Sequence, residues 1–93
     1  MEGKEMSAIK PRITQAIVRV LQECKGRALP LRALATYANA RSGVPAALDD
    51  IQLHVSDLQV KGYVEQVASP LNPSSLEYRI SELGEQVPLP PDV

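Results

Sequence analysis

The sequence contains very few aromatic side chains. Its 93 residues include no Phe and no Trp, and three Tyr supply all of the aromatic content. The core must therefore be built from Leu, Ile, Val and Ala. A chain of this length forms one domain and buries roughly two-thirds of its unfolded surface. Because the core is small, we expect a partner protein or a second copy of the chain to cover part of the apolar surface.

Residues for metal or acid–base chemistry are equally scarce, with one cysteine, Cys24, and one histidine, His54. One cysteine excludes a disulfide within the chain and a cysteine-based metal cluster. Asp50 and Asp57 lie within helical reach of His54, but this spacing is common by chance. The sequence has no serine in a nucleophile elbow, no glycine-rich phosphate loop and no pair of catalytic carboxylates. We expect a protein that is not an enzyme and that holds no metal and no cofactor.

Long apolar runs are also missing. No segment is long enough to span a membrane, and no basic stretch is followed by an apolar leader. We therefore expect a cytoplasmic protein without a membrane partner.

The charges divide unevenly along the chain, although the net charge is only −1. Residues 1–41 carry eight basic and three acidic groups, a net of +5, whereas residues 42–93 carry two basic and eight acidic groups, a net of −6. Such polarity lets two copies associate basic face to acidic face, or lets the basic half meet a polyanion.

Three segments have the spacing of amphipathic helices, with apolar residues recurring every three or four positions. They cover residues 10–25, 31–41 and 47–61. Pro11 suits the first turn of the first helix and Gly26 its C-terminal end, while Gly43 and Pro45 break the chain after the second helix. Residues 1–9 lack a clear period and are predicted to form a flexible arm.

Two later segments, 63–68 and 76–80, are predicted to be strands, and residues 76–80 alternate apolar and polar side chains. Residues 69–75 between them are turn formers, so the pair is predicted to form a β-hairpin. Ser81 can cap a last short helix at about residues 82–87.

This order of three helices, a hairpin and a short helix resembles the winged helix-turn-helix fold. The motif LQVKGYV at 58–64 is similar to the end of the third helix in bacterial regulators of the MarR, PadR and ArsR type. The motif YRISELG at 78–84 is similar to the stretch that closes their wing. Small phage-encoded winged-helix proteins are also similar in length and order. The resemblance implies an α+β, mainly α domain at residues 10–87, followed by a Pro-rich tail at 88–93.

In winged-helix proteins the third helix lies in the major groove and the wing touches the DNA backbone or minor groove. The resemblance therefore implies a dimeric transcriptional regulator that binds double-stranded DNA. The candidate DNA contacts lie on or beside the second and third helices: Arg27, Arg32, Arg41, Gln52, Ser56 and Lys61.

The charges of the third helix depart from this family pattern. Asp49 and Asp50 stand at its start, where regulators usually supply basic or neutral polar residues, and the loop 69–75 has no charge. Carboxylates at a helix start also suit the helix dipole. Because phosphate contacts need Lys or Arg, an alternative function is protein–protein interaction through an acidic third helix.

Two further apolar residues of the third helix favour this alternative. Leu53 and Val60 are seven positions apart and share one helical face, about 200° from Ile51 on the core side. With Asp49 they form a candidate partner surface, for a homodimer or for another protein. Isolated exposed apolar residues are nevertheless common on protein surfaces.

Overall fold

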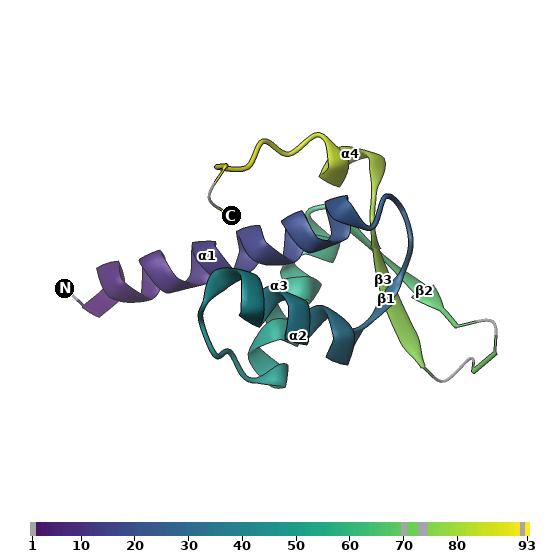
Figure 1. Ribbon diagram of the computed structural model, residues 1–93, viewed down its shortest axis with the longest axis horizontal. Helices are drawn as coiled ribbons and strands as arrows, with labels where there is room; N and C mark the ends of the chain where they lie inside the picture. The colour runs from purple at the N-terminus through teal and green to yellow at the C-terminus, as the bar shows by residue number, and fades with distance from the viewer. Residues whose placement is uncertain (1, 70, 73–74, 92) are drawn as a thin grey trace.

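The computed structural model describes residues 2–69, 71–72, 75–91 and 93, with side chains from Arg12 onward. The fold is α+β and mainly helical, as predicted. The elements are, in chain order, α1 (Glu2–Glu23), β1 (Leu29–Pro30), α2 (Leu31–Ser42), α3 (Leu48–Val60), β2 (Val64–Ala68), β3 (Leu76–Ile80) and α4 (Glu82–Glu85). In Figure 1, α1 lies above α2 and α3, and the hairpin of β2 and β3 projects at one end.

Helix α1 begins earlier than the sequence predicted. It is helical from Glu2, whereas the prediction placed its start at Lys10 and an arm at residues 1–9. Residues 2–10 include the good helix formers Glu, Lys, Met and Ala, so the helix continues through them. Pro11 therefore lies inside the helix and not in its first turn. The side chains of the predicted arm lie outside the described residues.

The core lies where the three long helices meet the sheet. Its largest fully buried side chains come from all three helices: Ile17, Leu21, Leu34, Ile51 and Val55. From the sheet, Val64, Tyr78 and Ile80 are buried against them. The predicted apolar stripes of the helices thus supply most of the core, and Cys24, which follows α1, is partly buried.

The sheet has one strand more than the sequence predicted. Strand β1 pairs antiparallel with β3, with Leu29 opposite Tyr78, and the strand order is β1-β3-β2. The predicted hairpin is present, with Val64 opposite Ile80 and Ala68 opposite Leu76. Residues 70, 73 and 74 of the predicted loop lie outside the described part.

The C-terminal segment runs back along α1 (Figure 1). Gln22 Nε2 donates to the carbonyl oxygens of Gly84 at 3.0 Å and Val87 at 3.1 Å, and Arg19 donates to Pro90 O at 3.1 Å. Val87 and Leu89 pack against the core. The prolines keep this predicted tail extended, but its carbonyl groups and apolar side chains hold it on α1.

Ser81 joins the end of β3 to α4, as its predicted capping role requires. Its hydroxyl donates to Gly62 O at 2.6 Å and accepts from Gly84 N at 3.0 Å, and Ser81 is 9% exposed. Replacing it leaves the buried N–H of Gly84 and the partly buried carbonyl of Gly62 without this partner.

We expect Ser81→Ala to lower the free energy of unfolding by about 1–2 kcal/mol, the usual cost of losing a helix N-cap. Urea unfolding followed by circular dichroism measures the change. Ser56→Ala, at an exposed position of α3, is the matched control and should stay within about 0.5 kcal/mol of the parent chain. Equal stabilities for the two variants would contradict the capping role.

Candidate interaction surface

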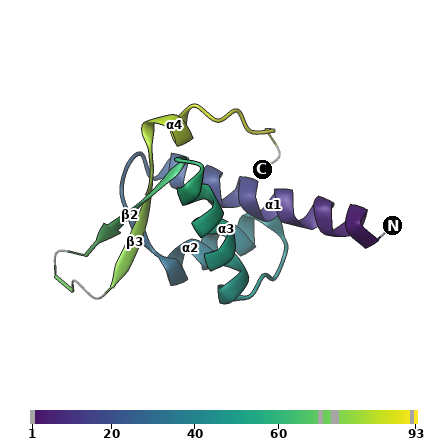
Figure 2. The same ribbon diagram turned by 180° about the vertical axis from the view of Figure 1, so that it is seen from behind.

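The outer side of α3 is the candidate site. Ile51, Val55 and Leu58 turn inward and are buried, so the opposite side of the helix faces solvent. At its centre lie the two apolar residues singled out from the sequence: Leu53 is 69% exposed and Val60 is 87% exposed. Figure 2 shows α3 in front of α2, open toward the viewer.

Carboxylates surround these two apolar side chains. Asp49 and Asp50 occupy the first turn of α3, and Asp57 lies four residues beyond Leu53 on the same side. Asp57 pairs with Lys61 Nζ at 3.0 Å. Three carboxylates against one lysine leave a net charge of −2. We call this surface the α3 face: Asp49, Asp50, Leu53, Asp57 and Val60.

The hairpin beside α3 adds apolar surface but little charge. Gln59 Nε2 donates to Gln66 Oε1 at 3.4 Å, which places β2 next to the end of α3. Arg79 pairs with Glu65 at 2.9 Å across the two strands. Leu71 is 96% exposed and Leu76 is 45% exposed. The hairpin thus carries the exposed apolar side chains of Leu71 and Leu76, a paired Glu65 and the carboxylate of Glu77.

The six candidate DNA contacts do not all lie on the helix-turn-helix formed by α2 and α3. Gln52 and Ser56 are exposed on α3, and Lys61 follows that helix but is already paired with Asp57. Arg27 precedes β1 and Arg32 lies in the first turn of α2, and both are exposed. Both arginines belong to the basic first half of the sequence, whereas the α3 face carries acidic groups.

The sixth candidate, Arg41, is bound to other parts of the chain. Its Nη2 atom forms a short ion pair with Glu23 Oε1 of α1, and its Nη1 atom lies 3.4 Å from Val93 O. Phosphate binding would compete with both contacts. Arg27 and Arg32 are in none of the three salt bridges found among the described residues.

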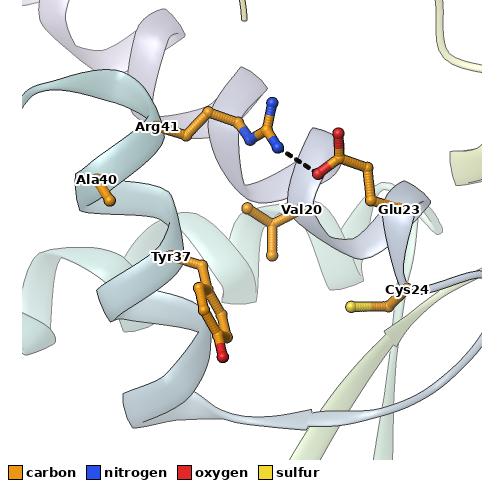
Figure 3. A pocket seen from close by; sticks show the side chains of 6 residues that line it. All are labelled: Val20, Glu23, Cys24, Tyr37, Ala40 and Arg41. Carbon is orange, nitrogen blue, oxygen red and sulfur yellow. Dashed lines mark hydrogen bonds and ion pairs between the residues drawn. The ribbon is translucent and has the colours of Figure 1, made fainter.

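A groove that the sequence did not predict lies between α1 and α2. Figure 3 shows Val20 from α1, Cys24 from the turn directly after α1 and Tyr37 from α2 along this groove, with Arg41 reaching across to Glu23. A second hollow shares Cys24 and Tyr37 and continues past Lys25 and Arg27. No periodic signal marks such a groove, because it depends on how two helices pack. We call it the α1–α2 groove: Val20, Glu23, Cys24, Lys25, Arg27, Tyr37, Ala40 and Arg41.

His54 has a structural partner across the helices. Its Nδ1 atom lies 3.2 Å from Thr14 Oγ1 of α1, so the ring links α3 to α1. In the part of the chain with described side chains, no group of three or more His, Cys, Asp or Glu residues is arranged to hold a metal ion.

Comparison with known proteins yields no family. Neither a protein-family model nor a curated protein matches this sequence. Within the described residues, none of the helices has the length and apolarity needed to cross a lipid bilayer.

Proposed function

We propose that this chain is a winged-helix domain that binds a protein partner through the α3 face. The element order α1-β1-α2-α3-β2-β3 supports the winged-helix assignment, since a helix-turn-helix is followed directly by a hairpin. One observation carries the functional part: the outer side of α3 presents exposed Leu53 and Val60 among three carboxylates.

The chemistry of this face defines the partner. A DNA backbone would meet repulsion from Asp49, Asp50 and Asp57, because affinity for DNA comes largely from cations that contact phosphates. A protein surface with a basic rim and an apolar centre would instead complement the face in both charge and polarity. We therefore assign the α3 face to a basic protein surface with an apolar hollow.

DNA binding by a transcriptional regulator is the second candidate. Exposed Arg27 and Arg32 favour it, since they lie beside and at the start of α2, which approaches the backbone in helix-turn-helix proteins. In that case the contacts would come from the α2 side, with α3 contributing Gln52 and Ser56.

Fluorescence anisotropy separates the two functions. One labelled probe is a helical peptide of lysine and leucine, with leucines at i, i+4 and i+7. The other is a mixed-sequence duplex DNA. We expect the peptide to bind, more weakly as salt rises, and Leu53→Asp to raise its dissociation constant at least tenfold. We expect no binding of the duplex at either of two salt concentrations.

Leu83→Asp is the matched control, because Leu83 is 51% exposed on α4 and lies beside Gly62, outside the α3 face. It should bind the peptide as the parent chain does. Salt-sensitive duplex binding that Arg32→Ala abolishes and Leu53→Asp leaves intact would overturn the proposal in favour of DNA. Equal loss of peptide binding in the two Leu→Asp variants would also overturn it.

A further inference from the structure

We propose that the basic partner surface is the α1–α2 groove of a second copy, so that copies of this chain associate head to tail. The inference rests on the proposed function, since it uses the same α3 face and names its partner. It requires that one molecule carry both complementary surfaces, on sides that do not block each other.

The two surfaces match in charge. The groove is bordered by Lys25, Arg27 and Arg41 against one carboxylate, Glu23, a net of +2. The α3 face has a net of −2, from its three aspartates and Lys61. Opposite net charges on two patches of one chain favour contact between unlike patches and oppose contact between like patches.

They also match in polarity. Val20, Cys24, Tyr37 and Ala40 give the groove an apolar lining, and Tyr37 is 56% exposed. Exposed tyrosines beside a hollow are frequent anchors of protein interfaces. Leu53 and Val60, about 10 Å apart along α3 at 1.5 Å per residue, would enter the groove while the aspartates approach its cationic border.

The surfaces face different directions. Figure 1 shows α2 in front of α3, and the reverse view of Figure 2 shows α3 in front of α2. One molecule can therefore use its α3 face and its groove at the same time. A contact between two different patches is heterologous, and it builds chains of molecules unless the rotation closes a ring.

Light scattering and sedimentation velocity of the parent chain, from about 20 μM to about 1 mM, test the association. A contact of one helix in one groove falls in the small, transient class of interfaces, so this range is needed. We expect the mean mass to rise beyond that of a dimer with concentration at low salt. It should fall toward the monomer in 0.5 M salt, because the contact is partly ionic.

Two variants determine the geometry. Leu53→Asp damages only the α3 face, and Tyr37→Glu damages only the groove; both residues are exposed, so the fold should persist. Each variant alone should be monomeric. An equimolar mixture retains one intact face and one intact groove, and should therefore form a 1:1 dimer and nothing larger. Leu83→Asp should associate as the parent chain does.

A parent chain that stays monomeric throughout would overturn this inference. So would a parent assembly that stops at a dimer, or a mixture of the two variants that stays monomeric. Those results leave the proposed function standing if the lysine–leucine peptide still binds the α3 face. Loss of peptide binding specificity, by contrast, removes the proposed function whatever the oligomeric state.

Discussion

Gly84→Ala should destabilise the fold by about 3 kcal/mol, although a Gly to Ala change inside a helix normally stabilises it by about 1 kcal/mol. A Cβ at this position would overlap the carbonyl oxygen of Tyr63 and lie 2.6 Å from Ile80 Cδ1. The carbonyl is backbone and itself accepts from Ser81 N at 3.0 Å. It therefore cannot move without breaking the link between the end of β3 and the turn at residues 61–63, which joins α3 to β2. Overpacking of this kind outweighs the gain in helix propensity.

Urea unfolding of Gly84→Ala beside Glu85→Ala measures this effect. Glu85 is the next residue of α4 and is exposed, so its substitution should change the free energy of unfolding by no more than about 0.5 kcal/mol. A Gly84→Ala protein as stable as the Glu85→Ala protein would show that α4 does not lie against the turn before β2.

Ile51→Ala, made as a separate variant, should lower the free energy of unfolding by roughly 2–5 kcal/mol. This is the usual range for removing a large aliphatic side chain from a core. Ile51 is fully buried at 0% exposure, in a core cluster to which α1 and α2 also contribute. The loss combines the transfer of the missing methyl and methylene groups with the cavity that remains. Thermal or urea unfolding gives the magnitude.

Leu53→Ala is the matched control on the same helix. Leu53 lies two residues from Ile51 but is 69% exposed, so we expect a change within about 0.5 kcal/mol. This contrast also supports the binding experiments, because it shows that Leu53 can be altered without loss of the fold. An equal loss of unfolding free energy in Ile51→Ala and Leu53→Ala would mean that α3 is rotated about its axis from the orientation described.

Sequence periodicity predicted α3 and the hairpin closely. The predicted range 47–61 differs from Leu48–Val60 by one residue at each end, because Ile51, Val55 and Leu58 recur at helical spacing and Gly62 ends the run. The strand 76–80 matches β3 without difference. Local sequence patterns predict the bounds of an element when the pattern extends over several helical turns or strand pairs.

Features that depend on long-range contacts were missed. Strand β1 has two residues, too few for any alternation to show. Val18 lies off the predicted apolar stripe of α1 but is buried. It precedes Gln22 by one helical turn, on the side where Gln22 holds the C-terminal segment. The exposed position of Leu53 followed from helical geometry alone, whereas the α1–α2 groove required the packing of two helices.

The pairing of β1 with β3 has a consequence for the order in which the chain folds. Leu29 and Tyr78 are opposite one another, so their contact closes a loop that contains α2, α3 and β2. Closing a long loop lowers the entropy of the chain. The pairing of only two residues of β1 provides little stabilisation to offset that loss. The hairpin of β2 and β3 closes over a much shorter stretch. We expect β1 to join the sheet late, after α2 and α3 have brought the ends of the loop together, and amide hydrogen exchange at Leu29 to be faster than at Tyr78.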